Sequence, residues 1–260
     1  NLRLPQDLLR VDTEEDLCES CAVGKPTFSF AYTPQYRSTE KGKLWYFDVS
    51  GGGDIAPSLL YGNRYTYLFT DSFSRIYFTY FTKEVNDRTT LSVLNIFADQ
   101  VLTMLPESDD MRFIQSDNGQ IDSNNVKGWI RQKRLMNRFI HPYHPNMNGF
   151  AERAFRSIKD LARCMMHHAG LPEPYWEKAT NHACLIRNIM PNQTQNGFVR
   201  EAYYLWYGLV YDYSRLRTWG SRAYALNHVQ GKNFLDRSVP GIFVGMKPQN
   251  PISYDYELYL

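Results

Sequence analysis

The stretch Leu44-Trp45-Tyr46-Phe47-Asp48-Val49 is an apolar run that reaches an acidic residue near its end. Aromatic and β-branched side chains favour extended chain, so we predict a strand over Lys43–Val49 with Asp48 close to its terminus. A second apolar run, Met111-Arg112-Phe113-Ile114, is followed two residues later by Ser116-Asp117-Asn118-Gly119. The same pattern predicts another carboxylate, Asp117, at or near a strand end.

A third carboxylate, Glu152, lies in Asn148-Gly149-Phe150-Ala151-Glu152-Arg153, at the start of a strongly basic segment with helical spacing and 35 positions after Asp117. Mg²⁺ prefers hard oxygen ligands, and two such ions about 3.5–4 Å apart can activate an attacking oxygen and stabilise a leaving oxygen. Carboxylates from two strands and one helix therefore predict a divalent-metal site for phosphoryl transfer.

Each carboxylate also has a simpler interpretation. Asp117 could be an ordinary turn residue, Glu152 could complement the positive end of its helix, and Asp48 could merely end a strand before a glycine run. The three residues together, at this spacing, favour catalysis. Asp71 also ends an apolar run, but Asp71-Ser72-Phe73-Ser74 is more typical of a hairpin turn than of a metal ligand.

Periodicity divides the middle of the chain into alternating strands and helices. Strands are predicted at Lys43–Val49, Arg64–Thr70, Arg75–Phe81, Met111–Gln115 and Arg138–Ile140. Helices are predicted at Asp87–Leu105, Ser123–Met136, Asn148–Ala169 and Pro172–Ile189. This order describes an α/β fold, a mixed five-stranded sheet with helices on both faces.

Taken in order, the motifs resemble the Asp-Asp-Glu integrases of copia-type long-terminal-repeat retrotransposons. The marks outside the three carboxylates are Cys18-Glu19-Ser20-Cys21, Phe69-Thr70-Asp71-Ser72-Phe73-Ser74-Arg75, Trp219-Gly220 and Val239-Pro240-Gly241-Ile242-Phe243-Val244-Gly245. One such string is weak evidence, but these four together with the three-carboxylate core make five marks in sequence, which is specific. The resemblance implies a ribonuclease H-like catalytic core at 41–195, after the tail of a zinc-binding domain and linker at 1–40. A helical connector at 196–214 and the start of a small β-barrel at 215–260 would follow.

The resemblance also implies a polynucleotidyl transferase that joins 3′-hydroxyl ends of element DNA to target DNA, with or without 3′-end processing. Asp48 and Asp117 would bind the first of two Mg²⁺ or Mn²⁺ ions, and Glu152 would help to hold the second. The implied partners are element DNA ends, target DNA, further copies of the chain and other domains of a Pol polyprotein. The implied location is a virus-like particle or the cytoplasm, and then the nucleus.

Two rival functions remain open at this point. A ribonuclease H-type nuclease would use the same carboxylates with water as its nucleophile. A domesticated or degenerate element protein would only bind DNA or protein.

Cys18 and Cys21 form half of a tetrahedral zinc site, which the resemblance completes with two upstream histidines. No histidine precedes Cys18, so this chain is expected to hold zinc weakly unless upstream residues are present. The pair His141 and His144 lies in a proline-containing segment, which indicates a loop. Histidines in such a loop are more often exposed or in contact with DNA than ligands of a metal ion.

The segment 123–163 has nine basic and two acidic residues, whereas the whole chain has a net charge of +2. A charge run is usually a solvated face, but next to a proposed metal ligand it indicates a phosphate-binding surface. We expect it to surround the active site. Helical geometry places Arg156 and Lys159 on the face of Glu152, pointing toward incoming phosphates. The candidate DNA-binding residues are Lys127, Arg131, Arg153, Arg156, Lys159 and Arg163.

Composition sets wide limits. A chain of 260 residues with 43% hydrophobic residues can bury a full core. It has no membrane-spanning apolar run and no signal peptide, so we expect a soluble, intracellular protein without membrane contact. Its first residue, Asn1, suggests a piece of a longer protein. The aromatic residues Tyr203, Tyr204, Trp206 and Tyr207 indicate a core more than a base-stacking surface.

Overall fold

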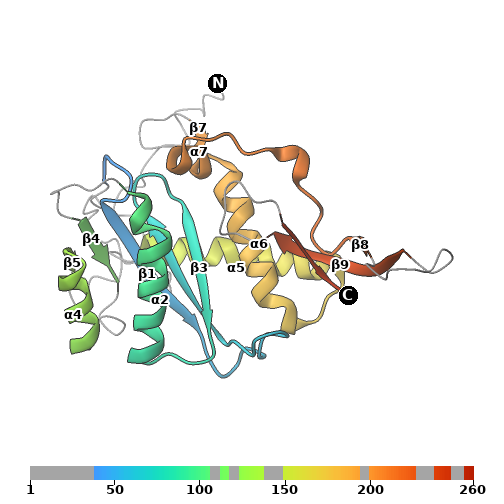
Figure 1. Ribbon diagram of the computed structural model, residues 1–260, viewed down its shortest axis with the longest axis horizontal. Helices are drawn as coiled ribbons and strands as arrows, with labels where there is room; N and C mark the ends of the chain where they lie inside the picture. The colour runs from blue at the N-terminus through green and yellow to red at the C-terminus, as the bar shows by residue number, and fades with distance from the viewer. Residues whose placement is uncertain are drawn as a thin grey trace, which may run out of the picture. The chain divides into compact units, whose positions relative to one another are not determined.

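A five-stranded mixed sheet forms the centre of the protein (Figure 1). The structure, a computed structural model, describes residues 38–105, 112–116, 123–137, 149–193, 199–226, 237–246 and 255–260. The strand order is β3-β2-β1-β4-β5, with β1, β2 and β3 antiparallel and β4 and β5 parallel to β1. The strands are β1 (Leu44–Gly51), β2 (Tyr65–Asp71), β3 (Tyr77–Thr82), β4 (Arg112–Gln115) and β5 (Leu135–Asn137).

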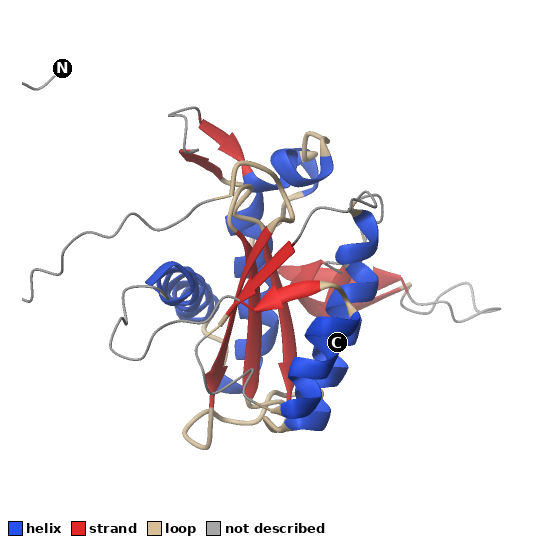
Figure 2. Cartoon of the chain, turned by 90° about the vertical axis from the view of Figure 1, so that its left-hand side faces the viewer, coloured by secondary structure: helices blue, strands red, loops and turns tan. Residues whose placement is uncertain are grey.

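Helices cover both faces of this sheet, as Figures 1 and 2 show. They are α2 (Asp87–Gln100), α4 (Asn124–Gln132), α5 (Gly149–Ala169), α6 (Trp176–Ile189) and α7 (Ala202–Tyr207). Short 3₁₀ turns are η3 (Leu102–Met104), η5 (Glu173–Tyr175) and η6 (Tyr213–Arg215). Buried residues of α2, α4 and α7 share one core cluster, and those of α5 and α6 share another. The predicted α/β class and its mixed five-stranded sheet are thus confirmed.

Aromatic side chains fill the core between the sheet and α2. The rings of Phe69 and Phe97 stack with centroids 4.1 Å apart, and Trp45 meets Phe97 edge-on at 4.9 Å. All three are almost fully buried. Since the burial of one such side chain stabilises a fold by roughly 1.5–3 kcal/mol, this cluster holds α2 against the strands.

The fifth strand does not lie where the sequence pattern predicted it. The chain leaves α4 after Gln132, and Arg134 adopts a left-handed φ of 53° that ends the helical geometry. Leu135 then pairs with Arg112 of β4 and is buried, because its apolar side chain completes the core beside α4. The prediction of a helix that continues to Met136 was therefore wrong, whereas the predicted strand at Arg138–Ile140 lies outside the described residues.

Beyond the central sheet lie two small antiparallel sheets. β6 (Pro191–Gln193) pairs with β7 (Val199–Glu201). The other sheet has the order β10-β9-β8, with β8 (Arg222–Leu226), β9 (Ser238–Met246) and β10 (Tyr256–Tyr259), and packs against α6. Short strands are thus present in the region of the predicted small barrel, whereas its closure stays a prediction. Among the described residues, no helix is both long and apolar enough to cross a membrane.

Candidate active site

Asp48 lies on the face of β1 that α5 covers. Side chains alternate along a strand, so Leu44, Tyr46, Asp48 and Ser50 share one face. Leu44 and Tyr46 form a buried cluster with Ala151 of α5, which identifies that face. Asp48 itself is partly buried, and its Oδ1 accepts a hydrogen bond of 2.9 Å from the N–H of Val49. Its carboxylate therefore lies on the side of the sheet that α5 covers.

Glu152 is held in the first turn of α5 by the packing of that helix. The apolar residues Ala151, Ala154, Phe155, Ile158 and Ala162 recur at helical spacing and are buried against the sheet and α6. Glu152 follows Ala151 directly but is exposed, so it stands at the rim of the buried face. The N-terminal turn of a helix favours a negative charge, which makes this position a suitable one for a carboxylate.

Lys159 connects α5 back to β1. Its ammonium donates a hydrogen bond to Oγ of Ser50, and its side chain passes over the ring of Phe155, with Nζ 5.4 Å from the ring centroid. Half-burial of the ammonium lowers the pKa of Lys159, and the nearby Asp48 carboxylate opposes that shift in part. The sequence analysis predicted that Lys159 points outward toward incoming phosphates. In the structure Lys159 instead reaches inward, toward Ser50 and the neighbouring Asp48.

The third predicted carboxylate, Asp117, lies outside the described residues, as do Cys18, Cys21, His141 and His144. β4 runs parallel to β1, with Tyr46 opposite Gln115, and the described chain continues to Ser116. The described residues, which do not include Asp117, contain no cluster of three His, Cys, Asp or Glu side chains that could hold a metal ion. The metal assignment for Asp48, Asp117 and Glu152 therefore stays a prediction.

The basic segment does not surround the candidate site. Lys127 and Arg131 belong to α4, whose buried residues pack in the cluster of α2. Arg153, Arg156 and Lys159 belong to α5, on the opposite face of the sheet. The sheet separates the two groups, so charges that are near in sequence lie on different sides of the molecule. Only the α5 group shares a face with Asp48.

The remaining α5 cations differ in their surroundings. Arg153, Arg156 and Arg163 are exposed. Arg163 pairs with Asp160 at 2.8 Å, whereas no ion pair joins Arg156 to another described residue. Helical spacing would also allow Arg156 to pair with Glu152 or Asp160, but no such ion pair is found in the described part of the chain. Arg153 and Arg156 are the exposed cations closest in sequence to Glu152.

Asp71 is a structural residue, as its turn context predicted. It is fully buried, and its carboxylate accepts hydrogen bonds from the N–H of Gly42 at 2.8 Å and from both N–H and Oγ–H of Ser74 at 2.7 Å. Burial raises the pKa of Asp71 more than these bonds lower it. The carboxylate thus ties the β2–β3 turn to the chain before β1.

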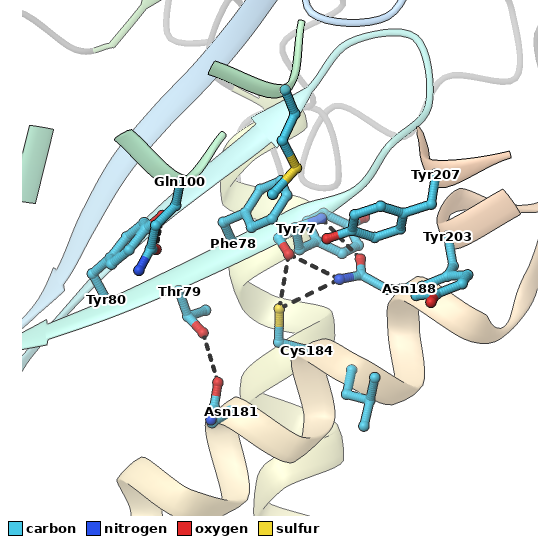
Figure 3. A pocket seen from close by; sticks show the side chains of 12 residues that line it. Tyr77, Phe78, Thr79, Tyr80, Gln100, Asn181, Cys184, Asn188, Tyr203 and Tyr207 are labelled. Carbon is cyan, nitrogen blue, oxygen red and sulfur yellow. Dashed lines mark hydrogen bonds between the residues drawn. The ribbon is translucent and has the colours of Figure 1, made fainter. Parts of the chain in front are cut away.

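Two cavities lie away from this site. One, of about 80 Å³, adjoins the edge strand β3 (Figure 3). There Asn188 of α6 accepts from the N–H of Tyr77 and donates to its carbonyl, both at 2.8 Å, while Cys184 donates to the same carbonyl at 3.2 Å. These bonds satisfy the edge of β3 and account for both buried side chains. The sequence pattern does not predict the contacts of Asn188 and Cys184, because their common partner is the backbone of Tyr77 and not a recognisable side chain.

The second cavity, of about 350 Å³, lies between the loop of Leu59, Leu60 and Tyr61, the start of α6 and β10. Neither cavity includes Asp48 or Glu152. Glu152 is exposed and Asp48 is partly buried, so the candidate site reaches the protein surface. Of the four aromatic residues at 203–207, Tyr203 and Trp206 are buried and Tyr204 is 37% exposed, which supports a mainly core role.

The chain is similar to known proteins of retrotransposons and retroviruses. No family model matches it. It is 29% identical over 233 residues to the retrovirus-related Pol polyprotein from transposon TNT 1-94 of Nicotiana tabacum. The match covers 88% of this chain and 17% of that polyprotein, so the chain spans about a sixth of the length of its relative.

Among solved structures, the simian T-cell lymphotropic virus intasome in complex with PP2A regulatory subunit B56 gamma aligns with a TM-score of 0.54 and 16% identity. That alignment covers 93% of this chain and 84% of the other. The core has the integrase fold. The HTLV-2 integrase catalytic core domain in complex with magnesium also aligns, at a TM-score of 0.47 and 17% identity, over 65% of this chain and 99% of that one.

The predicted resemblance to copia-type retrotransposon integrases is confirmed by the tobacco relative and by this fold. In this chain β1 and α5 lie against each other, and Ala151 of α5 packs with Leu44 and Tyr46 of β1. Sequence analysis missed the contact between Lys159 and Ser50. Alternation along β1 could have placed Ser50 beside Asp48, but it does not identify the helix that covers them.

Proposed function

We propose that this chain is the catalytic part of a retrotransposon integrase, a metal-dependent polynucleotidyl transferase that joins 3′-hydroxyl ends of element DNA to a target phosphodiester. The observation that carries this proposal is that Asp48 lies on the face of β1 that α5 covers, while Glu152 stands at the rim of the buried face of α5, in a core with the integrase fold. The relatedness to a retrotransposon Pol polyprotein supports the choice of DNA as substrate.

The donor set fits hard divalent cations. Asp48 and Glu152 offer only carboxylate oxygens, on a surface rather than in a sulphur- or imidazole-lined cavity, which favours Mg²⁺ or Mn²⁺ over a soft metal. In the sequence, Asp117 directly follows Ser116, the residue after the end of β4. We infer that it supplies the third carboxylate.

Two bound ions would activate the attacking hydroxyl oxygen and stabilise the leaving oxygen. The protein's own part is to hold the carboxylates and orient DNA. In this proposal, Asp48 on β1 and Asp117 would hold the first ion, and Glu152 on α5 would help to hold the second. Exposed Arg153 and Arg156 on the same helix are suited to bind the phosphates of the incoming strand.

The same proposal includes the surroundings of the reaction. We infer that element DNA ends and target DNA are the substrates, that several copies of the chain act together, and that other Pol domains accompany it in a polyprotein. Integration would take place in the nucleus, after a stage in the cytoplasm or a virus-like particle. A zinc site at Cys18 and Cys21 would form only with histidines supplied upstream.

The deciding experiment is a strand-joining assay with carboxylate variants. Asp48→Asn and Glu152→Gln each remove a ligand charge at nearly constant volume, and should lower the joining rate by at least ~100-fold, since such ligands contribute several kcal/mol to the reaction barrier. Labelled element ends, target DNA and Mg²⁺ are incubated with an integrase that includes its flanking polyprotein sequence, and cut and joined products are separated on a gel.

Asp54→Asn is the matched control, because Asp54 is an exposed acid only six residues after Asp48 in the following loop. It should join at the rate of the original protein. A Glu152→Gln protein with a normal circular dichroism spectrum and undiminished joining would refute the assignment. Cutting without any joining would favour the nuclease, and DNA binding with neither activity would favour the degenerate element protein.

A further inference from the structure

Asp48 has a positive charge of the protein's own beside it. Ser50 lies two residues after Asp48 on the same face of β1, and Lys159 donates to its Oγ. The Asp48 carboxylate acts on the Lys159 ammonium electrostatically at this position. An ammonium thus stands next to the carboxylate that the proposed function assigns to the first metal ion.

The other cations of α5 do not share this arrangement. Arg156, one turn before Lys159, is exposed, and Arg163, one turn after it, pairs with Asp160. Lys159 is half-buried because its stem lies over Phe155 and its head reaches the end of β1. Its charge is therefore directed at the site, while those of its helix neighbours are directed at solvent or at a surface acid.

We propose that Lys159 is a built-in competitor of the metal, a positioning residue whose ammonium neutralises Asp48 until divalent ions bind and displace it from Ser50. This inference rests on the proposed function, because it assumes that Asp48 is a metal ligand. Two cations beside one carboxylate repel each other, so metal binding and the inward position of Lys159 oppose each other.

The displaced ammonium has a second role in this scheme. A flexible four-carbon stem lets the head of a lysine move several ångströms without movement of its helix. Once Lys159 leaves Ser50, its charge can meet a DNA phosphate near the bound ions, as the sequence pattern of α5 predicted. Binding of the metal would then raise the affinity for DNA, and DNA would raise the affinity for the metal by the same factor.

Mn²⁺ binding to the full chain without DNA tests the competition. Free Mn²⁺ is measured by electron paramagnetic resonance at low salt for the original protein and for Lys159→Met, Arg156→Met and Asp48→Asn. Lys159→Met should bind Mn²⁺ about 3- to 30-fold more tightly, because a nearby repelling charge is removed at similar side-chain length. Arg156→Met removes an exposed charge of the same helix and should change the affinity by less than about twofold.

The outcomes separate this inference from the proposed function. Unchanged Mn²⁺ binding in Asp48→Asn would refute the metal site itself. Loss of binding in Asp48→Asn together with unchanged or weaker binding in Lys159→Met would retain the metal site and overturn the competition. Lys159→Arg, which keeps the charge, should bind Mn²⁺ as weakly as the original protein.

A second readout uses the original side chain, so it does not depend on the folding of a variant. Lysines are labelled by reductive ¹³C-methylation, and the Lys159 resonance is assigned by its loss in Lys159→Arg. Addition of Mg²⁺ should move this resonance toward the position of an exposed lysine, and the movement should be absent in Asp48→Asn. A Lys159 resonance that ignores Mg²⁺ while Mn²⁺ binds at Asp48 would also overturn the proposal.

Discussion

Asp48 and Asp71 follow similar apolar runs, yet they have opposite surroundings. Asp71 lies opposite Trp45 in the β1–β2 pairing, which places it on the α2 face, whereas Asp48 lies opposite Leu68 on the α5 face. Asp71 is fully buried with its oxygens occupied by Gly42 and Ser74. Strand parity therefore decides which carboxylate lies on the α5 face and which one lies on the α2 face and holds a turn.

His182 shows what burial without a partner does to a titratable group. It lies on α6 with 3% exposure, its ring meets Phe243 edge-on at 5.6 Å, and its Nδ1 has no hydrogen-bond partner in the described part of the chain. Desolvation lowers the pKa of His182 to about 4. The charged groups of the same interface are Lys178 of α6 and Glu257 of β10, which pair at 2.9 Å.

A lowered histidine pKa makes stability fall as the solution becomes acidic. Above about pH 6.5 the ring is neutral in both states, and between pH 6.5 and 4 the unfolded chain binds a proton that the folded protein does not. From pH 7 to 4.5, the free energy of unfolding should fall by about 2–3 kcal/mol more in the original protein than in His182→Gln. Urea titrations at both pH values measure this. Equal losses in the two proteins would show that His182 is protonated in the fold.

At the scale of elements, α4 and α5 carry most of the basic segment but lie on opposite faces of the sheet. α4 lies between the parallel strands β4 and β5 in sequence, and its residues Val126, Trp129 and Ile130 enter the α2-side core. α5 follows β5 and packs on the other face beside α6. Such a crossing requires a connection around the sheet, which a local charge count does not reveal.

The salt dependence of DNA binding tests which helix faces the DNA. The double variant Arg153→Ala, Arg156→Ala should reduce the slope of log affinity against log salt by up to about 1.8, at roughly 0.9 per lost phosphate contact. The double variant Lys127→Ala, Arg131→Ala on α4 should leave the slope nearly unchanged. Fluorescence anisotropy with labelled element ends at several salt concentrations gives both slopes.

The melting temperature is the control for this comparison, since exposed cations contribute little to folding. Equal slope changes for the two helices would mean that DNA crosses both faces around the sheet edge. A lowered melting temperature with an unchanged slope would show that the α5 arginines stabilise their helix instead.

At the scale of the whole molecule, the small sheet β8–β10 is packed against the helices α5 and α6 of the central fold. Trp219 is buried, and its Nε1 donates to the carbonyl of Val244 at 2.8 Å, while both residues pack in the cluster of α5 and α6. Gly220 has φ of 82°, and a Cβ there would lie 2.2 Å from that of Ala169 at the end of α5. The chain thus approaches the helix of Glu152 too closely for a larger residue.

This contact predicts that the small sheet and the core unfold together. Trp219→Ala removes a large buried side chain and should destabilise the protein by roughly 3–5 kcal/mol. Circular dichroism and near-ultraviolet signals should shift to lower denaturant together, with coincident midpoints. An early separate transition, with the core midpoint unchanged, would show that the sheet is an independent unit. Trp219→Phe is the milder comparison, since it keeps most of the apolar area but removes the donor.

Local chemistry in the sequence was sufficient to predict most elements. The alternation Leu44, Tyr46, Asp48 marks a strand with one polar end, and the spacing of Ala151, Phe155, Ile158 and Ala162 marks a helix with one buried face. Both patterns depend only on the periods of strand and helix. The error at β5 arose where Arg134 took a left-handed conformation that no residue type announces.

Tertiary structure decided which of these faces meet. Four basic residues between Lys127 and Arg134 and four between Arg153 and Arg163 look alike in sequence, but their helices, α4 and α5, pack in different core clusters. The contact of Lys159 with Ser50 likewise spans 109 positions. Sequence periodicity therefore determined which residues share a face of one helix or strand. Packing between these elements determined that Asp48, Glu152 and Lys159 lie on one side of the sheet. The periodicity of a helix or strand could not predict this, because it carries no information about which distant element packs against it.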